Sequence, residues 1–156
     1  MYIFSSQAQL RELCYLNNKI MQKNITYKTG IVPPIETIIE LYDDSGINRP
    51  TTDKPRIKKM YQHANLVITA WDGEQLVGIS RSITDFCYCC YLSDLAVKKV
   101  YQKQGIGEKL IAVTKEEIGT NAMLLLLSAP SAMAYYPKVG LETVKNGFII
   151  HREKMT

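Results

Sequence analysis

The sequence predicts an α/β (α+β) fold with a mixed, mostly antiparallel central sheet flanked by helices, and three observations support this. The dipeptide Asp72-Gly73 separates two apolar runs, which is the strongest short-range signal for a β-hairpin. A third apolar run, 87–97, leads into a glycine-containing loop and then a segment with helical periodicity. Strand-like and helical segments follow in turn to the end. This order is typical of a mixed fold and not of a doubly wound nucleotide-binding fold.

The segments before the hairpin are expected to be mainly helical. They are, in chain order, a helix over 5–21, a short strand over 24–28, a helix ending near Gly46 and a basic helix within 51–64. Pro33-Pro34 introduces the second of these helices. Asp53 is placed to cap the third, with Pro55 in its first turn.

From the hairpin onward the pattern predicts more strands than helices. The expected elements are strands over 65–71, 74–83 and 87–97, a helix over 106–118, a buried strand over 122–127, a short helix over 130–139, and two final strands near 141–145 and 147–152. Gly119 is placed to end the first of these helices, and Pro130 to begin the second.

Length and composition predict one domain over residues 1–156, with residues 1–22 as an N-terminal helical extension. The chain is 46% hydrophobic and carries a net charge of +4, from basic residues that are scattered along the sequence. This distribution does not predict a nucleic-acid surface. The longest apolar run, 122–127, is too short to span a membrane, and the first residues do not resemble a signal peptide. We therefore expect a cytoplasmic protein.

Three of the four cysteines crowd into residues 86–91, with the sequence FCYCCY. A metal site would need further Cys or His ligands at characteristic spacings, and the two histidines, His63 and His151, show none. Free cysteine is among the most buried residue types. We expect these thiols to fill the core and not to bind a metal.

The loop between the third strand and its helix contains two glycines, Gly105 and Gly107. It lacks the third glycine of a dinucleotide fingerprint, because Leu110 stands there, and it lacks the lysine of a P-loop, because Glu108 follows Gly107. A helix N-terminus offers unpaired N–H groups and a positive partial charge, which suit a phosphate. The alternative is that the glycines only shape a tight turn, and the loop by itself does not decide between the two.

The segment LAVKKVYQKQGIGEKLI, 95–111, resembles the acyl-CoA loop of the GNAT acetyltransferase superfamily. Gln102, Gly105 and Gly107 fall on the signature positions, and the expected order of elements matches over about residues 24–152. The resemblance implies an N-acetyltransferase that moves an acetyl group from acetyl-CoA to a primary amine by direct transfer in a ternary complex. It implies no metal, no nucleic acid and no membrane partner.

The resemblance also implies which residues hold the cosubstrate. The loop that would bind the pyrophosphate of coenzyme A comprises Gln102, Lys103, Gln104, Gly105, Ile106 and Gly107. The strand before it, at Leu95, Ala96 and Val97, would bind the pantetheine arm. The Leu95 N–H would lie near the thioester carbonyl, where a fixed donor stabilises the oxyanion that forms when an amine attacks.

A second segment, 129–141, keeps part of the pattern that the family usually carries after the next strand. It retains Tyr136, which matches the tyrosine that protonates the departing thiolate in several members, and a phenol has a suitable pKa for that step. It departs at Ala129, Pro137 and Leu141, where Asn, Glu and Phe are common. Packing of Tyr135 and Tyr136 against the sheet is the alternative interpretation.

The general base is not specified by the resemblance. Asp94 is the carboxylate nearest the expected thioester position and is a candidate base, although a pairing with Lys or Arg explains it as well. The acceptor amine is expected over the two early helices, and a homodimer is common among similar proteins. The departures in 129–141 leave open a second function, an acyl-CoA-binding sensor or regulatory module without catalysis.

Overall fold

The computed structural model describes residues 24–153. The chain falls into two compact units, one up to Leu125 and one from Leu126 onward, and each is described by itself below. The expected helix over 5–21, and the extension over 1–22, lie outside the described residues. In the first unit the mixed fold predicted from the sequence is confirmed.

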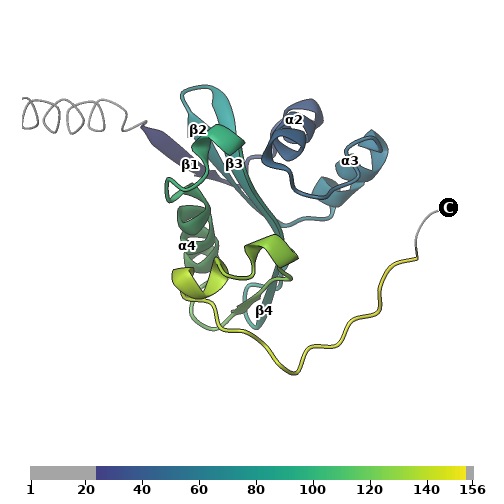
Figure 1. Ribbon diagram of the computed structural model, residues 1–156, viewed down its shortest axis with the longest axis vertical. Helices are drawn as coiled ribbons and strands as arrows, with labels where there is room; N and C mark the ends of the chain where they lie inside the picture. The colour runs from purple at the N-terminus through teal and green to yellow at the C-terminus, as the bar shows by residue number, and fades with distance from the viewer. Residues whose placement is uncertain (1–23, 154–156) are drawn as a thin grey trace, which may run out of the picture. The chain divides into compact units, whose positions relative to one another are not determined.

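A five-stranded sheet with the order β1-β2-β3-β4-β5 forms the centre of the first unit (Figure 1). Its strands are β1 (Ile25–Thr29), β2 (Leu66–Asp72), β3 (Gln75–Thr84), β4 (Cys89–Val97) and β5 (Met123–Leu125). Neighbouring strands are antiparallel except β4 and β5, which are parallel. The predicted hairpin between β2 and β3 forms, but its two-residue turn is Gly73-Glu74, one residue later than predicted, because Asp72 still pairs with Gln75. Gly73 has a positive φ of 58°.

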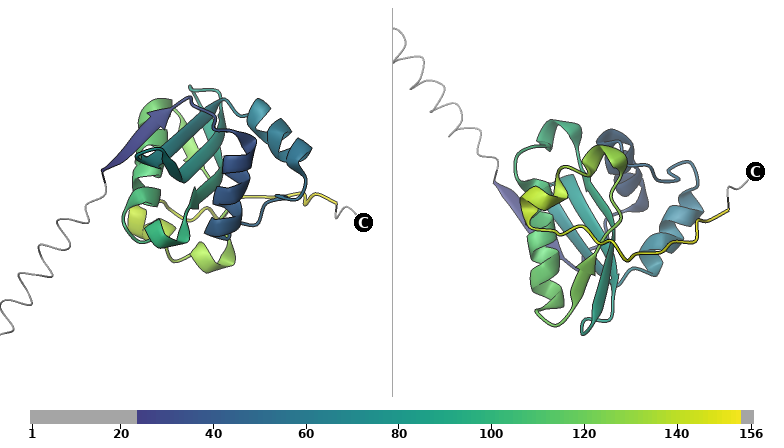
Figure 2. Two further views of the ribbon diagram at one scale, coloured as in Figure 1. Left: turned by 90° about the horizontal axis from the view of Figure 1, so that it is seen from above. Right: turned by 60° about the horizontal axis from the view of Figure 1, so that its bottom comes forward.

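Helices cover both faces of this sheet (Figures 1 and 2). Helix α4 (Ile106–Ile118) lies on one face, whereas α2 (Ile35–Ser45) and α3 (Lys54–Gln62) lie on the other. Two capping predictions hold: the Asp53 carboxylate accepts the N–H of Arg56 at 3.0 Å, and Gly119 follows the last residue of α4 in a positive-φ conformation. Each helical layer encloses its own apolar cluster against the sheet.

Helix α4 packs unusually close to the sheet at Gly78 of β3. A Cβ placed on Gly78 would lie 3.1 Å from Leu110 Cδ1 and 3.2 Å from Ile106 Cγ2. Both partners belong to α4, and Ile106 is its first residue. The absence of a side chain at residue 78 therefore sets the distance between the sheet and the N-terminus of α4.

Strand β4 contains a β-bulge at Ser93. Arg81 of β3 pairs with Asp94 and the next residue, Ser82, pairs with Leu92, so Ser93 has no partner position. Cys90 before the bulge and Leu95 after it pack in the same α4-side cluster, although side chains an odd number of residues apart in a regular strand point to opposite faces. The bulge thus directs Asp94 and Ala96 toward α2 and α3.

The structure corrects the expectation for the cysteines. Strand β4 begins at Cys89 and not at residue 87, because the Asp85 carboxylate accepts the backbone N–H groups of Cys87, Tyr88 and Cys89 and folds the preceding residues into a tight loop. Cys87 and Cys89 are exposed, so the prediction that they fill the core is wrong. Cys90 is buried, as expected.

The region after α4 departs most from the sequence prediction. Of the strand expected over 122–127, only Met123–Leu125 forms, and Met123 and Leu127 are exposed. The helix expected over 130–139 is replaced by two short 3₁₀ turns, Pro130–Ala132 and Tyr136–Val139, since Pro137 supplies no N–H to an α-helical ladder. No strand forms in 141–153, although two were predicted, near 141–145 and 147–152. An isolated pair of strands is marginally stable at best.

Candidate active site

The second half of β4 has an open edge. Pairing with β5 covers only Cys89, Cys90 and Tyr91, whereas β4 continues to Val97. Leu95 and Val97 are half-buried, and their backbone lies on the part of β4 that β5 does not reach. An extended ligand would find unpaired strand backbone there.

The loop that follows β4 ends at an uncapped helix N-terminus. Residues 102–105 are exposed, and Lys103 and Gly105 both adopt positive φ, of 61° and 81°. Gly105 precedes the first turn of the 13-residue helix α4, where no side chain caps the N–H groups. These donors, with the positive end of the helix dipole, form a site suited to a phosphate.

Side-chain amides of the loop bind backbone carbonyls and hold the loop in place. Gln102 Nε2 donates to the Val97 carbonyl at 2.9 Å and to the Ser45 carbonyl at 3.3 Å, so it joins the ends of β4 and α2. Gln104 Nε2 donates to the Val100 carbonyl at 2.8 Å. The signature glutamine thus shapes the loop, while the backbone N–H groups that follow remain available for a ligand.

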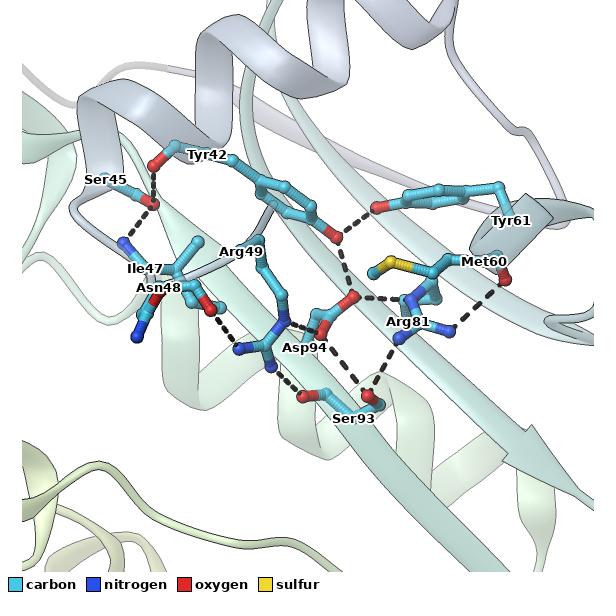
Figure 3. A network of polar contacts seen from close by, with 10 residues as sticks. All are labelled: Tyr42, Ser45, Ile47, Asn48, Arg49, Met60, Tyr61, Arg81, Ser93 and Asp94. Carbon is cyan, nitrogen blue, oxygen red and sulfur yellow. Dashed lines mark hydrogen bonds and ion pairs between the residues drawn. The ribbon is translucent and has the colours of Figure 1, made fainter. Parts of the chain in front are cut away.

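A buried polar network centred on Asp94 lies on the face of β4 that α2 and α3 cover (Figure 3). One carboxylate oxygen, Oδ1, accepts from Arg49 Nε at 2.5 Å. The other, Oδ2, accepts from Arg81 Nε and from the Tyr42 hydroxyl, the latter at 2.8 Å. The Tyr42 and Tyr61 hydroxyls lie 2.6 Å apart. Both guanidiniums also bind Ser93: Arg49 Nη2 donates to its carbonyl at 2.5 Å and Arg81 Nη2 to its hydroxyl at 2.8 Å.

These contacts decide the protonation of Asp94. Burial raises the pKa of a carboxyl, but the hydrogen bond and charge of Arg81 and the charge of Arg49 outweigh it, and the pKa of Asp94 is lowered. Burial likewise opposes the charge of Arg81, but Asp94 raises the pKa of that guanidinium above its ordinary value. Asp94 is therefore an anion paired with two cations, and a carboxylate whose pKa is lowered is a weak proton acceptor.

The two tyrosines of this network are neutral. Burial is the main cause that raises the pKa of Tyr42 and of Tyr61, and the nearby Asp94 carboxylate raises both further. The Tyr61 ring also lies under the Arg81 guanidinium, with 5.7 Å between the guanidinium carbon and the ring centroid.

Tyr136 lies in the second unit, at the start of its last 3₁₀ turn. It is half-buried and contacts Tyr135 edge to face, with ring centroids 5.3 Å apart. Burial raises the pKa of Tyr136, so the phenol is protonated at neutral pH and has a proton to give.

The structure thus brings Leu95, Ala96, Val97 and the loop 102–107 together and surrounds Asp94 with arginines. Sequence reasoning missed this network. No motif in the sequence singles out Arg49, and Arg81 lies within a strand pattern. Arg49 is 45 residues from Asp94 in the chain, so no local spacing indicates the contact.

The family follows from comparison with known proteins. The family model of the acetyltransferase (GNAT) domain matches residues 42–151, which is most of the chain. The chain belongs to the GNAT acetyltransferase family. No curated protein sequence matches it.

Solved structures of GNAT proteins share this fold at low sequence identity. A GNAT-family acetyltransferase from Streptococcus pneumoniae TIGR4 is 24% identical with a TM-score of 0.64, covering 83% of this chain and 99% of that one. A probable acetyltransferase from meticillin-resistant Staphylococcus aureus is 22% identical with a TM-score of 0.68, covering 81% and 100%. An aminoglycoside N-acetyltransferase in complex with CoA is 13% identical with a TM-score of 0.63, covering 85% and 96%.

Two further features are absent from residues 24–153. No helix in this range is both long and apolar enough to cross a membrane. No group of three or more His, Cys, Asp or Glu side chains in the same range is placed to hold a metal ion.

Proposed function

We propose that this GNAT-family protein is an N-acetyltransferase that moves the acetyl group of acetyl-CoA to a primary amine by direct transfer in a ternary complex. The observation that carries the proposal is the open edge of β4, which runs into the exposed glycine loop and the uncapped start of α4. A ligand with an extended arm and a pyrophosphate matches both parts. The CoA complex of a structural neighbour with the same fold supports this assignment.

In this proposal the chain contributes mainly backbone donors. The loop from Gln102 to Gly107 binds the pyrophosphate through the N–H groups that follow Gln102, whose own N–H donates to the Lys99 carbonyl. The edge at Leu95, Ala96 and Val97 binds the pantetheine arm. The Leu95 N–H donates to the thioester oxygen as negative charge develops on it. Much of the rate increase then comes from holding amine and thioester together.

The transfer step balances with one acid and solvent. The amine nitrogen attacks the thioester carbonyl carbon, the carbon–sulfur bond breaks, and Tyr136 protonates the departing thiolate. The attacking nitrogen, which is cationic once it is bonded to the carbonyl carbon, loses its extra proton to water, and solvent returns a proton to Tyr136. We do not assign the base role to Asp94, because its oxygens already accept from Arg49, Arg81 and Tyr42. Asp94 is instead proposed to position the strand that carries Leu95.

Thermal unfolding with ligands tests the proposal. A ligand at a hundred times its dissociation constant adds about 2.7 kcal/mol, which raises the unfolding midpoint of a chain of this size by about 5–10 °C. We expect this shift with acetyl-CoA and not with ATP or NAD, and we expect Gly107→Trp to abolish it. A protein that unfolds at the same temperature with and without saturating acetyl-CoA would refute the proposal.

Detection of the acetylated product distinguishes catalysis from binding of acetyl-CoA alone. Acetylated amine, detected by mass spectrometry after incubation with acetyl-CoA, is expected with the native protein and strongly reduced with Tyr136→Phe. A sensor or regulatory module would be favoured if acetyl-CoA raises the unfolding midpoint, equally in the native protein and in Tyr136→Phe, while no amine is acetylated.

A further inference from the structure

The buried network around Asp94 carries an excess of positive charge. It contains two guanidiniums and one carboxylate, and Asp94 is the only carboxylate that ion-pairs with either arginine within residues 24–153. Tyr42 and Tyr61 add no negative charge, since both are neutral. The formal charge of the network is therefore +1. An excess charge that is partly removed from water is unfavourable unless a counter-ion approaches it.

The excess charge is accessible at Arg49 and not at Arg81. The Arg81 side chain is 6% exposed, whereas that of Arg49 is 25% exposed. A guanidinium has five N–H groups. Arg49 uses three hydrogen bonds, to Asp94, to the Ser93 carbonyl and, at 2.7 Å, to the Asn48 carbonyl. Two N–H groups of Arg49 thus remain for a further acceptor.

The two carboxylates nearest to Arg49 in the chain bind other groups: Asp53 caps α3, and Asp44 accepts the N–H of Lys99 at 2.8 Å. Asp43 lies exposed on α2. Within residues 24–153, Asp94 is the carboxylate that forms an ion pair with Arg49. The partly exposed side of Arg49 is therefore a cationic surface beside β4.

Arg49 also lies close to the expected reaction centre. It follows α2 in the chain and contacts Ser93 and Asp94, which directly precede Leu95 (Figure 3). A group bound to Arg49 would therefore lie near an amine that attacks a thioester held at the Leu95 N–H.

We infer that Arg49 binds an anionic group of the acceptor, so that the substrate is an amine that also carries a carboxylate or a phosphate. The inference rests on the proposed acetyl transfer. Polycationic amines, the class to which aminoglycosides belong, would meet like charge at this position. A bidentate contact from the two remaining N–H groups would instead orient an acid-bearing amine.

Pairs of amines that differ only in the anionic group test this inference. We would compare phenylalanine with phenylalanine amide, and phosphoethanolamine with ethanolamine, using spermidine and kanamycin as polycationic probes. Initial rates with saturating acetyl-CoA are followed by mass spectrometry of the acetylated product. We expect kcat/KM to favour the anionic member of at least one pair by about tenfold or more, since hydrogen bonds between charged groups are of that strength. Which pair shows the preference identifies carboxylate or phosphate.

Variants locate the effect at Arg49. Arg49→Met is expected to remove the preference, and Arg49→Lys to keep part of it. Lys58→Met, which removes an exposed charge from α3, should leave the preference unchanged. The acetyl-CoA shift is measured for each variant, so that loss of folding or of cosubstrate binding is recognised separately.

Several outcomes would overturn the inference while acetyl-CoA still binds. The first is that phenylalanine amide and ethanolamine react as fast as, or faster than, their anionic partners. The second is that spermidine or kanamycin is preferred, and the third is that neither anionic amine reacts. The fourth is a preference for the anionic amine that persists in Arg49→Met. The wild-type comparison alone suffices if Arg49→Met does not fold. A protein without an acetyl-CoA shift would instead refute the proposed function itself.

Discussion

On the α4 face of the sheet the buried side chains are mostly apolar, whereas the α2–α3 face holds a carboxylate and a guanidinium beside its apolar cluster. The buried polar contact between α4 and β3 on the first face is a neutral one, between the Ser80 and Thr114 hydroxyls at 3.0 Å. Strand β4 is common to both faces. One face therefore positions the backbone N–H groups at the start of α4 through close apolar packing, and the other positions charged side chains through ion pairs.

Because the α2–α3 face depends on ion pairs, we expect the largest loss of stability from a substitution of Asp94. Asp94→Asn removes the negative charge that two guanidiniums share. Loss of one partner from a buried ion pair typically lowers the free energy of unfolding by about 3–5 kcal/mol. We expect the unfolding midpoint to fall by about 6–20 °C in a chain of this size. Thermal or urea unfolding measures the change.

Asp43→Asn is the matched control for this substitution, because Asp43 lies exposed on α2. Its effect should stay within about 0.5 kcal/mol. An Asp94→Asn protein as stable as Asp43→Asn would show that the ion pairs do not support the α2–α3 face.

The α4 face should respond to added volume and not to removed charge. Gly78→Val places methyl groups against Leu110 and Ile106, and overpacking of this kind costs about 1–3 kcal/mol. Because Ile106 begins α4, we also expect weaker acetyl-CoA binding, measured by calorimetric titration.

Gly147→Ala is the control for this prediction. A Cβ at Gly147 lies 3.8 Å from its nearest neighbour, Val144 Cγ2, which is an ordinary contact. If Gly78→Val bound acetyl-CoA as tightly as Gly147→Ala, the close approach of α4 to β3 would have no role in the phosphate site.

Acid should gradually reduce the contribution of Asp94 to the free energy of unfolding. The pKa of Asp94 in the folded chain lies below the unfolded value of about 3.9, so the unfolded chain binds more protons in acid. The stability that Asp94 provides is complete above about pH 5 and is lost as the pH falls through the folded pKa, with a slope of at most about 1.4 kcal/mol per pH unit. Urea unfolding of the native chain and of Asp94→Asn should therefore give a difference that shrinks below about pH 5.

The pKa of Asp85 is also lowered, so Asp85 contributes to the acid dependence of stability as well. For this reason the native chain must be compared with Asp94→Asn. The Asp85 carboxylate accepts three backbone N–H groups, those of Cys87, Cys89 and Tyr88. Its contribution is the same in both proteins and cancels in the difference. A difference that stays constant down to about pH 3 would contradict the low pKa of Asp94.

Signals that act over a few residues predicted the fold well. Three features follow from side chains or glycines next to the structure that they determine: the β2–β3 hairpin, the Asp53 cap and the bounds of α4. The glycine loop before α4 was predictable for the same reason, because its glycines directly precede the helix, and phosphate binding there stays a prediction. The two strands expected in 141–152 are absent, because a strand also needs a partner, which a short apolar run does not provide.

The charged half of the site was not predictable, because it is assembled from distant segments. Tyr42, Arg49, Tyr61 and Arg81 come from α2, its following loop, α3 and β3, and only the fold brings them to Asp94. The bulge at Ser93 was equally hidden. A strand with one extra residue looks in sequence like a strand whose alternation is merely imperfect.

Insertions and deletions should therefore have unequal effects along β4. Removing Ser93 would join Leu92 to Asp94 in a regular strand and leave both on their present faces, because Ser82 and Arg81 already pair with them. That deletion loses the hydrogen bonds of Ser93 to the two arginines. One residue inserted after Asp94 would instead exchange the faces of Leu95, Ala96 and Val97, because side chains alternate along a strand. The same insertion in the exposed loop before Cys89 changes only the length of a turn. Evolutionary length variation in this protein is thus expected in that loop and excluded between the bulge and the end of β4.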